Sequence, residues 1–353
     1  MLERYEKMKV LVTGHKGFIG TVLVPMLLEK GHDVVGLDSD LFRNCTYGDE
    51  PTSVPEIIKD VRDADIKDVA GFDAVMHLAA LSNDLLGNIN PELTLDINYR
   101  ASVRLAELAK SADVPRFLFS SSCSMYGAAG DDFLNESAKF NPVTPYAESK
   151  VLSERDISKL ADDNFSPVFL RNSTAYGVSP RMRFDLVLNN LMAWAFTTGH
   201  ILMKSDGTPW RPIVHIEDIS RAFITLMEAP REKAHNQAFN IGLNEENYRI
   251  RELADIVKET ISGCDIEYAE GAGPDRRCYR VDFKKYTNTF PDNPLLWNAR
   301  KGAQQILESY KKFGLNKDEY EGIKYKRIAH IKHLMNEGLI EETLRWVSES
   351  VAT

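Results

Sequence analysis

The stretch TGHKGFIG, residues 13–20, separates two apolar runs, and this arrangement decides the fold. The run before it, residues 9–14, is rich in β-branched side chains and ends in glycine, which predicts a buried strand. The run after it, residues 18–31, predicts an apolar helix that ends at Gly31. Glycines between a strand and a helix allow a tight turn, so a pyrophosphate can approach the helix N-terminus closely.

Strands and helices alternate along the first half of the chain. Further strands are predicted at residues 33–38, 72–80, 116–122 and 167–172, with helices at 91–112 and 145–163. This alternation predicts a parallel sheet covered by helices on both faces, a Rossmann-type doubly wound α/β fold. After about residue 175 the pattern becomes mixed, with helices predicted at 184–198, 217–228, 249–262 and from 299 onwards. We therefore predict a dinucleotide-binding domain over residues 1–175, which includes the 145–163 helix, and a smaller mixed α/β substrate lobe over 176–353.

Composition narrows the class of protein. The 353 residues are 43% hydrophobic, enough for a large core and more than one lobe. The net charge is −9 and no basic run occurs, which disfavours binding to nucleic acid or to an anionic membrane surface. The four cysteines are far apart and no histidines cluster, so we expect reduced thiols and no metal site. The charged N-terminus and the lack of an apolar run of roughly 18 residues favour a cytoplasmic protein.

The glycine-rich stretch and the strand after it predict the cofactor. The stretch contains three glycines, Gly14, Gly17 and Gly20. Asp38 ends the following strand, where a carboxylate accepts hydrogen bonds from both ribose hydroxyls of an adenosine. It would also repel a 2′-phosphate, so NAD is favoured over NADP, although Lys16 and Arg43 lie near enough in sequence to weaken that preference. The alternative is a structural glycine turn with an unrelated aspartate. Asp60 follows a third strand, either beside an adenine amino group or as a solvated loop charge.

A second group of residues indicates acid/base chemistry. Thr144 is a predicted N-cap with Pro145 at the first helical position, so Tyr146 and Lys150 share one face of the first turns. An ammonium beside a phenol stabilises the phenolate and makes the tyrosine a usable general base. Such a pair on an exposed helix is also common without any function. The serine cluster FSSSCSMYG, residues 119–127, ends a preceding strand and favours the catalytic interpretation.

At this point the sequence resembles the extended short-chain dehydrogenase/reductases that act on nucleotide sugars, of the UDP-galactose 4-epimerase type. The matching stretches occur in family order from residue 9 to about 300: TGHKGFIG, GLD, KDVRD, HLAA, SSSCSMYG, PYAESK, LRNSTAYG, NNLM, DGTPWRPIVHIEDI and FNIG. The resemblance implies the fold, NAD as cofactor and a nucleotide-diphosphate sugar as substrate. It also implies a set of cofactor contacts: Gly14, Gly17, Phe18, Ile19, Gly20, Asp38, Asp60, Val61, Leu78, Ala79, Ala80, Asn98, Tyr146 and Lys150.

The resemblance implies a Ser/Tyr/Lys triad. The family serine lies four residues before the tyrosine of a Tyr-Gly pair, which is Tyr126 here and selects Ser122. Ser122 would hydrogen-bond the reacting sugar oxygen, Tyr146 would take or return its proton, and Lys150 would hold the nicotinamide ribose. Asn98 matches an asparagine that supports the lysine in relatives, and a buried structural asparagine is an equal interpretation.

Two departures from the family pattern bear on the reaction. Members that dehydrate or decarboxylate usually carry Asp-Glu or a Glu just after the catalytic serine or threonine, where this chain has Cys123 and Ser124. Relatives that epimerise next to a ketone use a cysteine at the second position, which is Ser124 here, so we interpret Cys123 as packed. The reactions that remain transfer only one hydride and one proton. This favours a sugar 4-epimerase, with a 4-dehydrogenase or 4-ketoreductase as alternatives, ahead of a 4,6-dehydratase or a non-catalytic dinucleotide sensor.

Substrate contacts are also implied by the resemblance. They form this set: Ser82, Asn83, Ser122, Ser124, Asn172, Thr174, Arg181, Arg183, Asn190, Arg211 and Arg277. An anionic ligand explains the group of arginines, although a surface role is open for each one, and the register among Arg276, Arg277 and Arg280 is open too. Ser82 and Asn83 also fit a plain polar loop, and Thr174 replaces the usual family asparagine.

Two remaining expectations concern packing and assembly. Residues 325–347 have apolar spacing suited to two amphipathic packing helices. A homodimer through the helices at 91–112 and 145–163 is expected from the resemblance alone.

Overall fold

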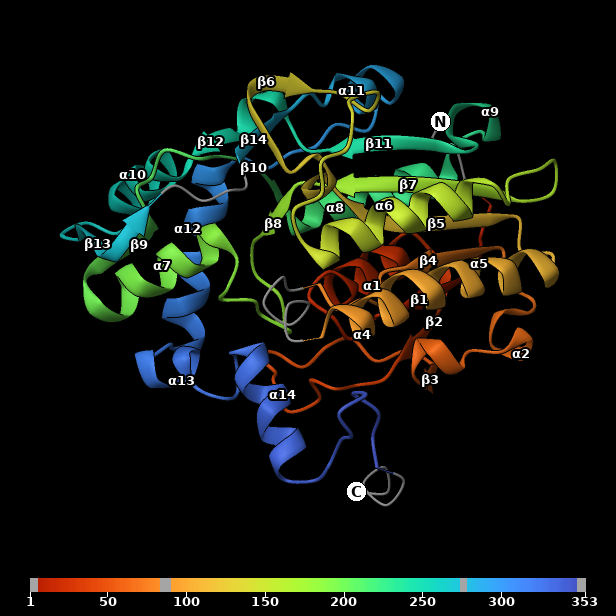
Figure 1. Ribbon diagram of the computed structural model, residues 1–353, viewed down its shortest axis with the longest axis horizontal. Coiled ribbons are helices and arrows are strands. Elements are labelled where there is room, and N and C mark those ends of the chain that lie inside the picture. The colour runs from red at the N-terminus through yellow and green to blue at the C-terminus, as the bar shows by residue number, and fades with distance from the viewer. Residues whose placement is uncertain (1–5, 83–89, 274–277, 348–353) are drawn as a thin grey trace.

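The computed structural model describes residues 6–82, 90–273 and 278–347 (Figure 1). Within this described part, a parallel sheet of seven strands has the order β11-β7-β5-β4-β1-β2-β3. Its strands are β1 (Lys9–Thr13), β2 (Asp33–Asp38), β3 (Glu56–Ile58), β4 (Ala74–His77), β5 (Arg116–Ser122), β7 (Ser166–Asn172) and β11 (Gln237–Ile241). The predicted doubly wound parallel fold is confirmed.

Helices cover both faces of this sheet (Figure 1). Helices α1 (Gly20–Glu29), α8 (Ile216–Glu228) and α11 (Lys284–Thr289) bury apolar side chains on one face. On the other face lie α5 (Ala101–Ser111), α6 (Pro145–Ser158) and α14 (Arg327–Asn336). Short elements fill the connections: η1 (Val61–Asp63), α2 (Ile66–Val69), α4 (Pro91–Leu95), η2 (Asp96–Arg100), η3 (Cys123–Tyr126) and α9 (Arg231–Ala234).

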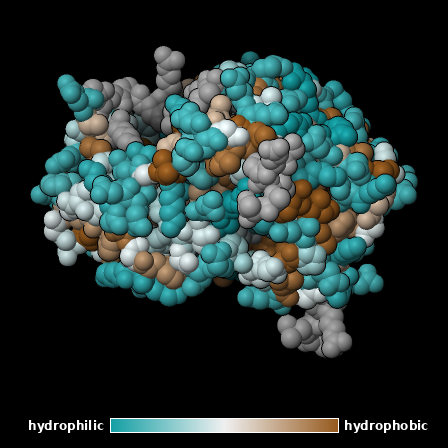
Figure 2. All heavy atoms as spheres, turned by 90° about the horizontal axis from the view of Figure 1, so that it is seen from below, coloured by the Kyte–Doolittle hydropathy of each residue, from teal (hydrophilic) through white to brown (hydrophobic). Residues whose placement is uncertain are grey.

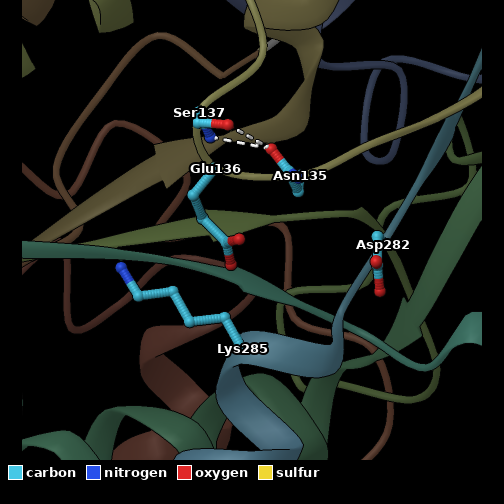
Figure 3. A pocket seen from close by; sticks show the side chains of 5 residues that line it. All are labelled: Asn135, Glu136, Ser137, Asp282 and Lys285. Atoms are coloured by element: carbon cyan, nitrogen blue, oxygen red, sulfur yellow. Dashed lines mark hydrogen bonds between the residues drawn. The ribbon is translucent and has the colours of Figure 1, made fainter.

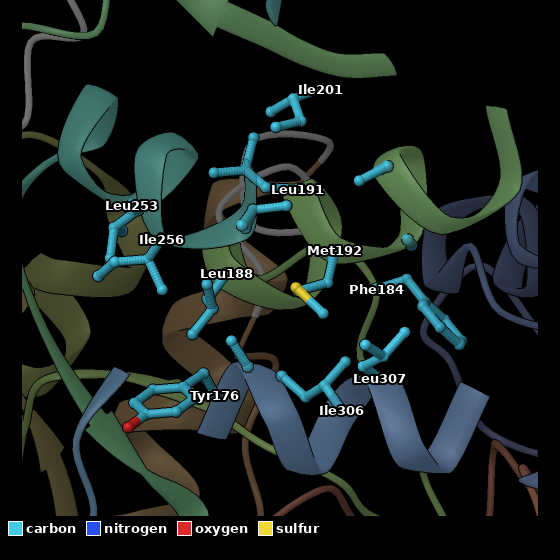
Figure 4. Packing of buried hydrophobic residues seen from close by; sticks show 14 of the residues in the cluster. Tyr176, Phe184, Leu188, Leu191, Met192, Ile201, Leu253, Ile256, Ile306 and Leu307 are labelled. Atoms are coloured by element: carbon cyan, nitrogen blue, oxygen red, sulfur yellow. The ribbon is translucent and has the colours of Figure 1, made fainter. Parts of the chain in front are cut away.

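A second core forms beside the carboxyl ends of these strands (Figure 4). It is built by α7 (Val187–Thr198), α10 (Ile250–Thr260), α12 (Ala299–Phe313) and α13 (Lys317–Glu321). Small sheets border it: β12-β10-β8 (Asn247–Arg249, Trp210–His215, Thr174–Tyr176), β13-β9 (Asp265–Gly273, His200–Ser205) and β14-β6 (Cys278–Val281, Ala128–Leu134), with η4 at Asn244–Glu246. Leu188, Leu191, Ile256 and Ile306 meet at its centre.

The second half of the chain also returns to the first core. Strand β11 pairs in parallel with β7 and forms one edge of the main sheet. Ile331 and Leu334 of α14, with Ile340 and Leu344 after it, are buried in the same cluster as β1 and β2 side chains. Segments from both sides of residue 175 thus build the sheet domain. The predicted boundary between two domains at residue 175 stays a prediction.

One helix prediction is wrong, and another is confirmed but with an irregular turn. Residues 325–347 form only one helix, α14, because Gly338 at a φ of +68° ends it and Ile340 then bridges to antiparallel Trp346. The predicted helix at 91–112 is interrupted by a π-turn at Asp96–Arg100, where the Asn98 carbonyl accepts hydroxyl hydrogen bonds.

The face in Figure 2 is mostly hydrophilic, with hydrophobic side chains in separate groups. No helix in the described ranges is long and apolar enough to cross a membrane. All four cysteines are free thiols. Within the same ranges, no three His, Cys, Asp or Glu side chains gather where they could hold a metal ion.

Candidate functional site

The glycine turn has no room for side chains at Gly14 and Gly20. Gly14 has a φ of +73°, and a Cβ built on it would lie 2.7 Å from the nitrogen of Ala79. A Cβ on Gly20 would lie 2.3 Å from the Gly14 oxygen. The backbone N–H of Gly17 donates to that same oxygen at 2.9 Å, so the turn closes tightly against the first residue of α1. This cradle fits a dinucleotide, because the unpaired N–H groups and the dipole at a helix N-terminus attract a pyrophosphate.

Asp38 is held at the end of β2. Its carboxylate accepts hydrogen bonds from the backbone N–H groups of Lys16 at 3.1 Å and Asp40 at 2.8 Å. Burial raises the pKa of Asp38, although these two hydrogen bonds act in the opposite direction. The Lys16 ammonium is shared between Asp40 at 2.7 Å and Glu56 at 2.8 Å. The charge of Lys16 is therefore already balanced by two carboxylates. This leaves little attraction for the 2′-phosphate of NADP.

Asp60 is bound by an arginine from its own turn. It caps η1: its Oδ1 accepts from Arg62 N at 2.8 Å and from Arg62 Nε at 2.9 Å, and its Oδ2 accepts from Arg62 Nη2 at 2.7 Å. Val61 beside it is buried. The contact between Asp60 and an adenine amino group remains a prediction. It would use Asp60 Oδ2, which already accepts one hydrogen bond from Arg62.

A buried polar chain lies behind the turn after β4. Thr13 Oγ1 and His77 Nδ1 are 2.6 Å apart, and His77 Nε2 lies 2.8 Å from Ser102 Oγ. Burial lowers the pKa of His77 to about 3, so the ring is neutral. The histidine of the HLAA motif therefore fixes the strand end that carries Leu78, Ala79 and Ala80.

Asn98 holds the loop that follows these residues. Its Oδ1 accepts from Leu81 N at 2.7 Å, and its Nδ2 donates to Leu81 O at 3.1 Å. Its backbone carbonyl also accepts from Ser153 Oγ at 3.1 Å, on the helix that carries Lys150. These contacts support the structural interpretation of Asn98, which positions both a loop and the Tyr/Lys helix.

Tyr146 and Lys150 occupy the first turns of α6 as predicted. Thr144 Oγ1 caps the helix by accepting from Ala147 N at 3.2 Å, and Pro145 is its first residue. Lys150 Nζ lies 5.7 Å from the centroid of the Tyr146 ring. It donates to Ser120 O at 2.7 Å, and burial lowers its pKa to about 7. The cation is therefore fixed beneath the phenol, and small changes in its surroundings would change its charge near neutral pH.

The serine cluster ends at the same edge of the sheet. Ser122 ends β5 opposite Asn172 of β7 in the parallel register. Its Oγ accepts from Ser124 N at 3.2 Å and starts η3. The Oγ of Ser124 and the Oδ1 of Asn172 are buried without a hydrogen-bond partner among the described residues. A polar ligand bound at Ser122 would satisfy both atoms.

Cys123 is packed, in agreement with the prediction. Its side chain is fully buried, and Sγ lies 3.0 Å from the carbonyl oxygen of Arg171. Burial raises the pKa of the thiol far above its usual range. A neutral thiol that faces a backbone carbonyl is not an acid/base group at neutral pH.

Two of the predicted substrate arginines, Arg183 and Arg181, contact different loops. Arg183 binds Asp185 through Nε at 3.0 Å and Nη2 at 2.7 Å, and its Nη1 donates to Ser82 Oγ at 3.1 Å. It therefore joins the loop after β4 to the segment before α7. Arg181 instead turns to the loop after β2, where it donates to Thr46 Oγ1 and, at 3.4 Å, to Arg43 O.

The remaining predicted substrate residues lie in the second lobe or outside the described residues. Asn190 Nδ2 donates to Phe184 O at 2.9 Å. Arg211 is buried on β10, with its guanidinium carbon 5.8 Å from the centroid of Tyr279. Thr174 lies on β8, opposite Ile213 of β10. Asn83 and Arg277, with Arg276, fall outside the described residues.

One buried ion pair was missed by sequence reasoning. Arg171 donates from Nε to both oxygens of Glu154 at 3.1 Å and from Nη2 at 2.7 Å. Both side chains are buried, and Arg171 Nη1 also donates to Tyr126 Oη at 3.1 Å. Glu154 lies one turn after Lys150, so the pair ties α6 to β7. The buried face of α6 also carries Ser149, Lys150 and Ser153, so no apolar stripe in the sequence marks Glu154 as buried.

A surface hollow lies at the β11 edge, apart from these residues (Figure 3). It is lined by Asn135, Glu136, Ser137, Asp282 and Lys285. Glu136 accepts from the backbone of β11 at 2.8 Å, and Lys285 Nζ donates to the carbonyl of Ala238 at 2.8 Å. The hollow shares no residue with the predicted catalytic, cofactor or substrate sets.

Comparison with known proteins agrees with the geometry. The NAD dependent epimerase/dehydratase family matches residues 10–242, about two thirds of the chain and all of the glycine turn, serine cluster and Tyr/Lys helix. The chain belongs to this family. It is an NAD-dependent enzyme of the extended short-chain dehydrogenase/reductase type, as the sequence predicted.

Relatives within this epimerase/dehydratase family differ in activity. The chain is 28% identical over 327 residues to the UDP-glucose 4-epimerase of Mycolicibacterium smegmatis, which covers 88% of this chain and 100% of the relative. It is 26% identical over 339 residues to UDP-glucuronic acid decarboxylase 1 of Arabidopsis thaliana, with 90% and 73% covered. Among solved structures, MoeE5 in complex with UDP-glucuronic acid and NAD has a TM-score of 0.74 and 27% identity, covering 86% of this chain and 99% of MoeE5.

Proposed function

We propose that the protein is a nucleotide-sugar 4-epimerase that acts by transient oxidation at C4 of the sugar. The observation that carries this proposal is the composition of the site around Ser122: a serine hydroxyl, the Tyr146 phenol and the Lys150 ammonium, followed by a buried thiol and a serine instead of carboxylates. Elimination or decarboxylation needs further acid/base help at carbons beside the ketone. The positions that supply it in other family members hold Cys123 and Ser124 here.

The mechanism assigns one role to each residue. Ser122 donates a hydrogen bond to the C4 oxygen, and Tyr146 takes the hydroxyl proton as the C4–H bond breaks. Lys150 stabilises the phenolate through its charge. Bound NAD supplies the acceptor, and later the donor, for the C4 hydride. Return of the hydride to the opposite face of the ketone, with the proton given back by Tyr146, completes the inversion without net redox change.

The cofactor would be held by the glycine turn, by Asp38 at the adenosine ribose and by Lys150 at the nicotinamide ribose. Ser124 Oγ and Asn172 Oδ1 support a polar substrate beside Ser122, because a sugar hydroxyl would satisfy these buried atoms. Arg211 and Arg277 would bind the diphosphate, together with Asn190. The UDP-sugars named for the relatives suggest uridine nucleotides as the first substrates to test.

The experiment is turnover of a panel of NDP-sugars by the purified protein, followed by product analysis and by absorbance of reduced nicotinamide at 340 nm. We expect two C4 epimers to interconvert, with NAD unconsumed over many turnovers. Stoichiometric reduction of NAD would instead support the alternative, a 4-dehydrogenase. Tyr146→Phe should lower kcat by about 10²–10⁴ while NAD affinity stays within twofold. Equal activity of this variant would favour a non-catalytic dinucleotide-binding protein.

We also propose a homodimer through α5 and α6, which lie on the same face of the sheet (Figure 1). Tyr99 Oη donates to Asp156 at 2.6 Å between the two helical segments, so their outer sides form one rigid surface. Light scattering at micromolar concentration tests this, since a mass near 80 kDa is expected from a chain of 39.9 kDa. A mass near that of the single chain would contradict it.

A further inference from the structure

The chain continues well beyond the family match, which ends at residue 242. Residues 325–347, here called the C-terminal strap, contain α14 and the bridged turn after it. Figure 1 shows this blue segment beside the orange connections that follow β2 and β3. The strap therefore lies at the predicted adenosine end of the dinucleotide site, far along the sequence from the residues that form it.

The loop at residues 39–47 is bound to the strap through its backbone. Three of its carbonyl oxygens each accept from a strap side chain: Ser39 O from Trp346 Nε1 at 2.6 Å, Leu41 O from His330 Nε2 at 3.0 Å, and Thr46 O from Tyr325 Oη at 3.2 Å. The loop itself forms neither helix nor strand. Two backbone hydrogen bonds inside the loop, from Arg43 N to Asp40 O and from Cys45 N to Phe42 O, also shape it, and the strap adds the three contacts above.

Side-chain packing strengthens the same contact. The Arg43 guanidinium carbon lies 4.0 Å from the centroid of the Trp346 ring. The Phe42 ring lies 4.5 Å from the Arg327 guanidinium carbon and 5.6 Å from the His330 ring centroid. Such cation–π and ring contacts stabilise by about 0.5–1 kcal/mol each when exposed and by more when buried.

The other edge of the predicted adenosine site meets the strap as well. Arg62, which holds Asp60, donates from Nη2 to Thr343 O at 2.8 Å. Arg345 pairs with Asp63 and lies 3.9 Å from Asp60. The strap therefore contacts the segments that follow both Asp38 and Asp60, the two carboxylates predicted to bind the adenosine.

One strained residue links the loop to the ribose carboxylate. Asp40 has a φ of +53°, which is uncommon for a residue with a side chain, and its backbone N–H donates to Asp38 Oδ1 at 2.8 Å. Strain of this kind persists only where surrounding contacts hold the backbone. The neighbours of Asp40 on both sides, Ser39 and Leu41, are the residues whose carbonyls the strap binds.

We propose that the C-terminal strap positions the adenosine wall of the NAD site and so determines how tightly NAD is bound. This inference rests on the proposed function, in which the adenosine of NAD lies at Asp38. An epimerase needs the same NAD through oxidation and return, so retention of the cofactor serves that reaction directly. Trp346 and His330 act as positioning residues, because they bind the loop backbone and not the cofactor.

The test measures binding of NAD and of ADP-ribose by calorimetry, in the absence of sugar. Trp346→Ala should weaken both about tenfold, and Trp346→Phe, which keeps a ring on Arg43 but loses the indole N–H, by about threefold. Lys332→Ala, on the exposed face of α14, is the matched control and should stay within twofold. Because no turnover is measured, absence of epimerase activity would leave this result unaffected.

Hydrogen exchange of residues 39–47 gives a second measurement in the milder variant. Exchange should be faster in Trp346→Phe than in the wild type and should slow again with NAD. Unchanged exchange and unchanged NAD affinity in a folded Trp346→Phe or Trp346→Ala protein would overturn the proposal. Weaker NAD binding with unchanged ADP-ribose binding would also overturn it, because the effect would then not lie at the adenosine end.

Discussion

Replacement of Lys150 by methionine tests how strongly burial suppresses the charge of this residue. Lys150 is only 3% exposed, and burial lowers its pKa from 10.5 to about 7. The folded state therefore binds fewer protons than the unfolded chain between these values. Stability rises with pH through this window, and below pH 7 the charged side chain carries its full penalty. At about 1.4 kcal/mol for each pH unit, the penalty is about 5 kcal/mol well below pH 7 and about 2 kcal/mol at pH 9.

Urea unfolding of the NAD-free protein at pH 6 and pH 9 measures this penalty. Lys150→Met removes the charge but also the hydrogen bond to Ser120 O, a loss that does not depend on pH. The free energy of unfolding of the variant minus that of the wild type should therefore be larger at pH 6 than at pH 9 by about 3 kcal/mol, which means that the variant gains more stability at pH 6. Lys332→Met, an exposed lysine on α14, should show no such dependence. An equal difference at both pH values would refute a pKa lowered by burial.

Three further predictions follow from the site. Gly14→Ala should abolish measurable NAD binding, because its Cβ would lie 2.7 Å from a backbone nitrogen at a φ of +73°; retained affinity by calorimetry would contradict the cradle. Cys123→Ala should keep kcat within threefold, since the thiol is fully buried, and a loss of 100-fold or more in steady-state turnover would show that the thiol takes part. Arg171→Met should lower the free energy of unfolding by about 3–5 kcal/mol, because it leaves Glu154 charged and buried, and restoration of stability by the double variant with Glu154→Gln checks that cause.

The sequence predicted the sheet domain well because its signals are local. The apolar runs that became β2 and β5 have the predicted bounds, and the glycine turn needs only backbone geometry that glycine alone allows. Thr144 and Pro145 likewise begin α6 where capping preferences place its start. Each of these features depends on residues close together in the chain.

The missed features depend on contacts between distant residues. The Arg171–Glu154 pair joins a strand to a helix, and the His77–Ser102 contact joins another strand to α5. Apolar spacing at the end of the chain predicts two helices, but the second apolar group packs on the sheet domain in a turn closed by the bridge between Ile340 and Trp346. Apolar spacing predicts that a segment is buried; it does not say which core the segment joins.

A sugar nucleotide labelled with deuterium at C4 tests the central claim most directly. With whichever NDP-sugar of the panel the protein converts, mass spectrometry and NMR of the product should show the deuterium still at C4, now in the epimer, with no label lost to solvent and no reduced NAD accumulating. Loss of deuterium to solvent, or its transfer to released cofactor, would contradict transient oxidation and return at C4.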